Sequence, residues 1–163
     1  MIVYVDSFNL YYGTLKNSNN KWLNISRLCS FLFPHDDIHK IKYYTAQIKL
    51  RPNDADTDKP NRQQIYLRAL RTLREVEIFY GTFLSHNVSM KLADGSGYAR
   101  VIKTEEKGTD VNIAAHLVHD AHEKQFEIAV VISNDSDLVE PIRIVTQELG
   151  FPVIIVSSQL VEV

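Results

Sequence analysis

Acidic residues directly follow two apolar runs that are far apart in the sequence. Asp135 and Asp137 come one residue apart after the run 128–132, and Asp6 comes after the run 2–5. A carboxylate at the end of a buried strand must be solvated, paired or bound to a metal, because burying an unpaired charge is costly. In an open parallel sheet, ligands bind at the carboxyl ends of the strands, so these acids can meet in one crevice.

A third acidic element, Asp110, stands at the start of a helical pattern. A helix start favours an acid, which explains Asp110 alone but neither Asp6 nor the pair after 128–132. Carboxylates about 4 Å apart repel by on the order of 4 kcal/mol at an effective dielectric of about 20. A hard cation relieves this repulsion, and oxygen ligands without Cys or His favour Mg²⁺ or Mn²⁺ over Zn²⁺. Two such ions about 3.5–4 Å apart can activate a water and stabilise a leaving oxygen in phosphodiester cleavage.

Apolar runs and helical patterns alternate along the chain, and they must position these acids. The patterns predict strands at 2–5, 40–48, 76–83, 128–132 and 153–156, and helices at 9–16, 25–33, 60–74, 109–124 and 140–149. Residues 85–106 alternate on both sides of a Gly-rich turn and predict a β-hairpin insertion. Continuously apolar strands that alternate with helices predict an α/β protein with a mostly parallel sheet of about five strands and helices on both faces.

Composition limits the function classes. The 163 residues suit one domain, and the net charge of −2 requires any nucleic-acid surface to be a local basic patch. A single cysteine, Cys29, excludes an intrachain disulfide and fits a cytoplasmic location.

Neither a signal peptide nor an apolar run long enough to cross a bilayer is visible, so no membrane partner is expected. No glycine-rich phosphate-binding pattern occurs, so a nucleotide cofactor is not expected either. Because the chain stops soon after an apolar strand, we expect a C-terminal helix to be missing.

Three blocks resemble a known family. Residues 3–9, 106–111 and 131–138 look like the signature blocks of the NYN domain, a branch of the PIN-like nuclease superfamily, and most like its bacterial LabA/DUF88 members. The blocks occur in family order, and the resemblance spans nearly the whole chain. It implies a Rossmann-like three-layer α/β/α fold and metal-dependent cleavage of RNA.

The resemblance also implies roles for single residues. By motif position, the metal-binding and catalytic acids would be Asp6, Asp110, Asp135 and Asp137. Residues that order the site or contact the substrate would be Asn9, Lys107, Ser133 and Ser136. Two positions depart from the family pattern. Asn134 stands where many members carry Gly, and His116 stands where many relatives have another acid, which would weaken a second metal site.

Further residues are candidates for RNA contact. Tyr12 follows Asn9 closely and could stack a base, although core packing is expected to explain at least one of Tyr11 and Tyr12. The hairpin and its end carry a basic set that could guide a polyanion to the acids, namely Lys91, Arg100, Lys103 and Lys107. For the arginine stripe Arg68, Arg71 and Arg74, a solvated helix face is favoured over an RNA-facing ridge.

Two other patterns resemble metal sites but lack essential parts. The histidines His116, His119 and His122 drift around their helix, which favours a solvated or partly packed face over a zinc site. The alternating acids Asp54, Asp56 and Asp58 resemble the start of a calcium loop. Such a loop needs a glycine at its sixth position and an acid at its twelfth, and Lys59 and Ile65 stand there instead.

The favoured hypothesis is a Mg²⁺- or Mn²⁺-dependent ribonuclease that acts on single-stranded RNA. Two alternatives stay open. One is an RNA- or protein-binding regulatory module that retains the acidic pocket. The other is a small-molecule phosphohydrolase, although Asp6 lacks the second aspartate two places on that such enzymes often carry. The sequence also leaves open whether the protein forms a homodimer.

Overall fold

A six-stranded sheet forms the centre of the molecule. The structure is a computed structural model that describes residues 1–50 and 54–157. The strand order is β4-β3-β2-β1-β5-β6, and every neighbouring pair is parallel except β3 and β4. The strands are β1 Ile2–Asp6, β2 Lys40–Ala46, β3 Val76–Lys91, β4 Tyr98–Lys107, β5 Ala129–Ile132 and β6 Val153–Val156.

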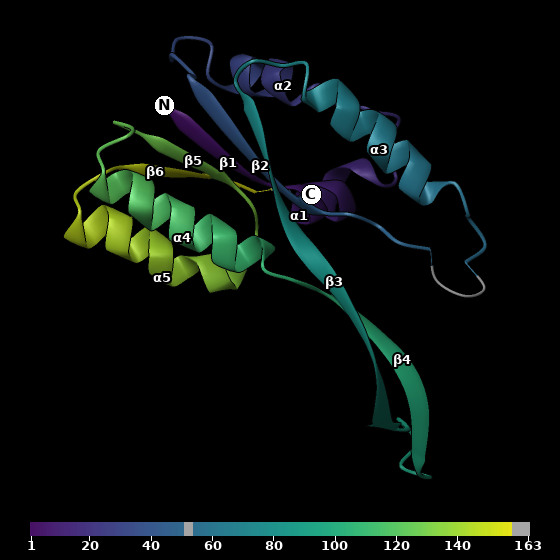
Figure 1. Cartoon of the computed structure of the whole chain (residues 1–163). Coiled ribbons are helices and arrows are strands. Elements are labelled where there is room, and N and C mark those ends of the chain that lie inside the picture. The colour runs from purple at the N-terminus through teal and green to yellow at the C-terminus, as the bar shows by residue number, and fades with distance from the viewer. Residues whose placement is uncertain (51–53, 158–163) are drawn as a thin grey trace, which may run out of the picture.

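Helices cover both faces of this sheet, so the predicted three-layer α/β/α fold is confirmed (Figure 1). One face carries α1 Ser7–Leu10, the π-helical turn η1 Tyr11–Leu15, α2 Ile25–Leu32 and α3 Lys59–Leu70. The other carries α4 Thr109–His122, the short 3₁₀ turn η2 Ser136–Leu138, α5 Val139–Arg143 and the π-helical turn η3 Ile144–Glu148. Among the residues that the structure describes, none of these helices has the length and apolar character needed to span a bilayer.

Strand β1 explains how one sheet holds two cores. Alternate side chains of a strand point to opposite faces. Val3 and Val5 therefore join the core beneath α1, α2 and α3, while Ile2 and Tyr4 join the core beneath α4 and α5. All five residues of β1 are buried, as the continuous apolar run predicts for a central parallel strand.

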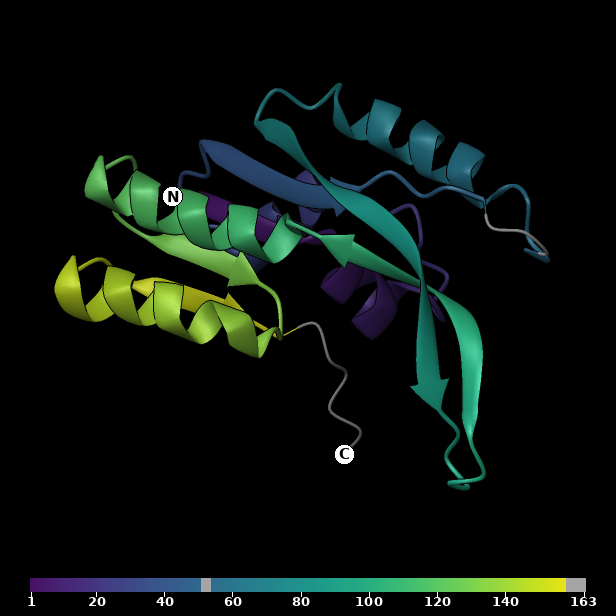
Figure 2. The same cartoon turned by 60° about the horizontal axis from the view of Figure 1, so that its bottom comes forward.

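Strand β3 is longer than predicted. The sequence indicates a strand at 76–83 followed by a separate hairpin at 85–106, whereas β3 runs unbroken from Val76 to Lys91. Strand β4 pairs with it from Thr82↔Lys107 to Lys91↔Tyr98, which makes the sheet six-stranded rather than about five-stranded. Ladder hydrogen bonds join backbone groups, so polar side chains in the middle of β3 do not end the strand. The outer part of β3 and β4 projects beyond the layers as a two-stranded ribbon (Figure 2).

The helix after β1 begins earlier than predicted. The sequence predicts a helix at 9–16, but α1 begins at Ser7 with Asp6 as its N-cap and continues as the π-helical turn η1. The segment predicted as one helix at 140–149 is likewise a 3₁₀ turn, an α-helix and a π-helical turn in succession over 136–148. The helix predicted at 60–74 ends at Leu70.

Candidate metal centre

Asp6 lies at the carboxyl end of β1 and is held by hydrogen bonds from two segments. It is only 4% exposed. Its Oδ1 accepts from the backbone N–H of Asn9 at 3.0 Å, and its Oδ2 accepts from the Ser133 hydroxyl at 3.0 Å. Ser133 is in reach because β1 and β5 are parallel neighbours whose ends align at Val5 and Ile132.

The turn after β5 positions Asp135. Its backbone N–H donates to the Ser133 hydroxyl at 3.1 Å, and its own Oδ1 accepts from the backbone N–H of Asp137 at 2.9 Å. The side-chain oxygen of Asn9 accepts from the backbone N–H of Asn134 at 3.1 Å. Asn9 and Ser133 therefore fasten the two loops to one another, which fixes the relative positions of Asp6 and Asp135.

Asp110 reaches the site from the first turn of α4. Gly108, with φ of +98°, occupies the N-cap and lets the chain turn from β4 into the helix. Thr109 donates to Glu106 through its backbone N–H, at 3.2 Å, and through its hydroxyl. At this turn β3 and β4 approach closely, and a Cβ on Gly81 would lie 2.7 Å from the Lys107 carbonyl oxygen. The glycines and Glu106 thus set the start of α4.

These three elements bring three carboxylates together. One oxygen each of Asp6, Asp110 and Asp135 lie within 4.8 Å of one another. Within the described ranges 1–50 and 54–157, no Lys or Arg forms an ion pair with any of them. Burial, followed by the charges of Asp6 and Asp135, raises the pKa of Asp110 to about 6. Burial also raises the pKa of Asp6. The arrangement therefore concentrates negative charge without a protein cation to balance it.

Asp137, the fourth predicted acid, lies outside this group of three. Its side chain is exposed in η2, as is that of Ser136. The charge of Asp137 is the smallest of the named contributions that raise the pKa of Asp110. Its backbone rather than its carboxylate contacts Asp135.

The basic residues and the tyrosine that are predicted to contact RNA are exposed, whereas Ser133 is buried and Asn9 is partly buried. Arg100, Lys103 and Lys107 are all exposed on β4. Two of them share one acid, because Glu105 lies 2.5 Å from the Lys103 ammonium and 3.3 Å from the Lys107 ammonium. Tyr12 is 60% exposed in η1. Tyr11 is exposed too, so core packing explains neither tyrosine.

His116, which stands where an acid was expected from the family pattern, packs away from the three carboxylates. Its Nδ1 lies 2.9 Å from the Tyr44 hydroxyl, and its ring meets Phe79 edge-on at 4.5 Å. Burial lowers the pKa of His116, which favours a neutral imidazole. His119 and His122 are exposed, and among the described residues the three histidines do not form a group with metal-ligand spacing.

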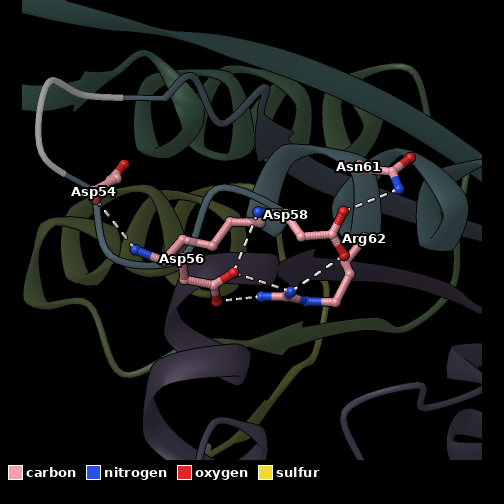
Figure 3. A network of polar contacts seen from close by, with 6 residues as sticks. Asp54, Asp56, Asp58, Asn61 and Arg62 are labelled. Atoms are coloured by element: carbon pink, nitrogen blue, oxygen red, sulfur yellow. Dashed lines mark hydrogen bonds and ion pairs between the residues drawn. The ribbon is translucent and has the colours of Figure 1, made fainter.

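The alternating acids before α3 are balanced by cations (Figure 3). Arg62 lies 2.5 Å from Asp56 and 3.4 Å from Asp58, and Lys59 lies 3.3 Å from Asp54. Asn61 donates a further hydrogen bond to Asp58. Asp58 holds the N-cap position of α3, but its side chain makes no capping hydrogen bond.

Glu106 has a part in the site that the sequence did not indicate. It belongs to the second signature block, yet its neighbours give no sign that its side chain turns back to Thr109. Its charge also raises the pKa of Asp110. The capping box places an acid three residues after a Ser or Thr, and Glu106 instead precedes Thr109 by three, so no capping pattern marks it.

Comparison with known proteins assigns the family. The model of the NYN domain matches residues 1–162. The chain belongs to the NYN family. This family is part of the PIN-like nuclease superfamily, so the chain has a nuclease-type fold, and the resemblance of the three signature blocks is confirmed.

Two individual proteins are similar to this NYN chain. One is "6-hydroxy-3-succinoylpyridine 3-monooxygenase HspA" of Pseudomonas putida, which is 28% identical over 88% of this chain and 54% of its own length. The chain thus spans about half of that relative. The other is the crystal structure of a protein of unknown function, VPA0982, from Vibrio parahaemolyticus, with 16% identity and a TM-score of 0.52 over 94% of this chain and 78% of that chain. At this identity the second likeness shows the fold alone.

Proposed function

We propose that this NYN protein is a metal-dependent endoribonuclease that cleaves single-stranded RNA, with Mg²⁺ or Mn²⁺ held by Asp6, Asp110 and Asp135. One observation carries the proposal. Three carboxylates from three distant segments lie within 4.8 Å of one another, and no lysine or arginine of the described chain pairs with them. Such a concentration of charge is tolerated at neutral pH when a cation binds among the oxygens.

The donor set fits a hard divalent cation. All three side chains offer oxygen, which Mg²⁺ and Mn²⁺ prefer, and neither Cys nor His joins the cluster. The raised pKa values of Asp6 and Asp110 have the same cause, since burial and mutual repulsion disfavour the ionised forms. A bound cation of this kind supplies an acidified water and neutralises charge on the phosphate and the leaving oxygen.

The chain's own groups would orient the reactants. Ser133 and Asn9 hold the loops that carry Asp6 and Asp135, so these carboxylates do not have to reorganise when a substrate binds. Asp137 is exposed next to Asp135 and would orient the attacking water. Lys107 and Arg100 would bind backbone phosphates, and Lys107 can leave its ion pair with Glu105 at little cost because the pair is exposed.

Features around the acids support a polymeric substrate over a small phosphate ester. Exposed basic side chains extend from the site along the ribbon, at Lys107, Lys103 and Arg100. Phosphate contacts of this type supply most of the sequence-independent affinity for nucleic acid. The exposed Tyr12 belongs to the turn that follows the helix capped by Asp6, and unpaired bases stack on such rings.

Incubation of the purified protein with labelled single-stranded RNA and Mn²⁺ tests the proposal. The wild type should cleave the RNA internally, Asp6→Asn should not, and Asp56→Asn should cleave like the wild type because Asp56 is already neutralised by Arg62. Binding without cleavage would instead support a regulatory RNA-binding module. Hydrolysis of a small phosphate ester alone would support a phosphohydrolase. Oxygenation of a pyridine with no cleavage would place the chain with the activity named for the Pseudomonas relative.

A further inference from the structure

Four aromatic rings gather where α1, η1 and β3 meet. Phe8 meets Phe83 edge-on, with ring centroids 5.7 Å apart and an interplanar angle of 71°. Tyr12 lies nearly parallel to Phe8 at 6.4 Å and 22°. Tyr11 meets Tyr12 edge-on at 5.3 Å and 82°. We call these four residues the aromatic cluster. Each ring supports the next, so the cluster is a continuous surface rather than separate side chains.

The aromatic cluster is connected through the backbone to the segments that carry Asp6 and Asp110. Phe8 lies in the helix that Asp6 caps, two residues after that carboxylate. Phe83 pairs in register with Glu106, whose carboxylate binds Thr109, the neighbour of Asp110. The elements that position Asp6 and Asp110 therefore also position Phe8 and Phe83.

The outer rings of the aromatic cluster are open to solvent. Tyr12 is 60% exposed and Tyr11 is 37% exposed, whereas Phe8 and Phe83 are half-buried beneath them. The turn that carries both tyrosines is π-helical, and such turns occur often at functional sites. Neither tyrosine belongs to one of the two buried cores. Core packing therefore does not account for them.

A cation accompanies the exposed ring. The Lys16 ammonium lies 5.1 Å from the centroid of Tyr12. None of the ion pairs in the described part of the chain includes Lys16. The ammonium can therefore move from the ring to a phosphate without breaking a bond to an acid. A ring face next to a free cation suits a nucleotide, which joins a flat base to an anionic phosphate.

We propose that the aromatic cluster is a nucleobase-stacking site, in which Tyr12 stacks an unpaired base of the RNA next to the phosphate that a cation bound by the carboxylates would hold. The proposal rests on the proposed function and adds how the strand is selected. In a duplex both faces of each base are covered by its neighbours, so only a single strand, loop or end can offer a face to Tyr12. The ring thus makes the site selective for unpaired RNA without reading its sequence.

Equilibrium binding to two matched RNAs tests the stacking site. Fluorescence anisotropy in EDTA would compare labelled oligouridine with the same ribose-phosphate chain carrying abasic sites, which keeps the charge and removes the rings. Tyr12→Ala should weaken binding of oligouridine at least about fivefold, the lower end for loss of one stacked base. It should leave binding of the abasic RNA unchanged. Tyr12→Phe should bind both RNAs like the wild type, because the ring remains.

A matched control lies on α2. Phe31 is 81% exposed near the end of that helix, which leads to the start of β2 and hence to the amino edge of the sheet. Phe31→Ala removes an exposed ring far from the site and should change neither affinity. Thermal unfolding of Tyr12→Ala and Phe31→Ala would verify that both variants fold.

The outcomes separate the two proposals. Equal losses on oligouridine and abasic RNA, or no more loss than in Phe31→Ala, would overturn the stacking site even if the wild type cleaves RNA. A second outcome is that Tyr12→Ala loses affinity for oligouridine alone, while the wild type binds RNA but does not cleave it in Mn²⁺. This result would support the stacking site and reject the nuclease. Absence of wild-type binding to either RNA would overturn the stacking site, and it would overturn the nuclease as well if the wild type also fails to cleave RNA in Mn²⁺.

Discussion

Two groups of three aspartates in this protein differ in what balances their charge. Asp54, Asp56 and Asp58 lie within five consecutive residues and are paired with Lys59 and Arg62 (Figure 3). The second group, Asp6, Asp110 and Asp135, comes from three distant segments and pairs with no lysine or arginine of the described chain. The Arg62 guanidinium holds the pKa of Asp56 below its usual value, whereas burial and neighbouring acids raise the pKa of Asp110 to about 6.

The difference shows that the neutralising partner, rather than spacing or number, distinguishes a candidate metal site from a surface network. The regular spacing of the first group resembles a calcium loop, yet its side chains already have cations from the protein. The second group has no regular spacing, and its members meet because parallel strands end at the same edge of the sheet. An acidic group left without a protein cation is the one expected to bind a metal.

The largest contrast between the groups should appear in catalysis. We expect Asp6→Asn to lower the rate of RNA cleavage by more than about 100-fold, which exceeds the usual effect of residues that only orient a ligand. Asp56→Asn should stay within about twofold of the wild type, since exposed ion pairs contribute little. Single-turnover cleavage at saturating Mn²⁺ would measure both rates. Similar losses in the two variants would contradict the distinction between the groups.

Metal-dependent stability should separate the groups next. Any ligand that binds only the folded state stabilises it, by about 2.7 kcal/mol at 100 times its dissociation constant. We therefore expect Mn²⁺ to raise the free energy of unfolding of the wild type and of Asp56→Asn, and chelation to reverse the effect. Asp110→Asn should lose most of this gain. Urea unfolding with and without Mn²⁺ would show it, and a gain that survives in Asp110→Asn would place the ion elsewhere.

The pH dependence of stability should have opposite signs in the two groups. The pKa of Asp110 is raised from 3.8 to about 6 in the fold, so the metal-free folded state holds more protons than the unfolded chain between these values. Its free energy of unfolding should therefore fall as the pH rises through that window, by roughly 1 kcal/mol because solvent screens a half-exposed group. Asp56 changes the free energy of unfolding with pH in the opposite direction. Its lowered pKa gives a contribution that is present above its usual value and lost as the pH falls.

Urea unfolding in EDTA between about pH 4 and pH 7 would measure these slopes, with Asp110→Asn as the reference. The substitution should remove the fall in stability on the way to neutral pH, and Asp56→Asn should leave that fall in place. An unchanged profile in Asp110→Asn would mean that burial and the neighbouring acids do not raise the pKa of Asp110.

The smallest effect should come from the cation of the surface network. Arg62→Gln leaves Asp56 and Asp58 exposed to water, so we expect only a small loss of stability and no change in RNA cleavage. Thermal unfolding and the cleavage assay would measure this. A loss of cleavage in Arg62→Gln would show that the network takes part in the function.

The strand ends could be predicted from the sequence because burial leaves a local signature. The apolar runs before Asp6 and before Ser133 indicate fully buried parallel strands, and parallel strands that are neighbours end together. The start of α4 at Thr109 follows from its pattern in the same way. From the ends of β1 and β5 and the start of α4, one expects Asp6, Asp110 and Asp135 to lie close together.

Other features depend on contacts between distant segments and left no local signal. Lys42 and Asp120, 78 residues apart, form a buried ion pair at 2.6 Å, to which the Tyr4 hydroxyl adds a hydrogen bond. In the sequence, Lys42 is a single charge in an alternating strand pattern and Asp120 a single charge in a helix pattern. Neither pattern indicates that the two residues pair. The side-chain pattern does not predict the unbroken length of β3, because the outer half of this strand is held by backbone pairing with β4.

A crystal grown in Mn²⁺ tests the central claim most directly, because the anomalous signal locates the ion without reference to activity. We predict a peak among the oxygens of Asp6, Asp110 and Asp135, and none among Asp54, Asp56 and Asp58. An empty acidic site at saturating Mn²⁺, or a peak at the aspartates paired with Lys59 and Arg62, would contradict the account.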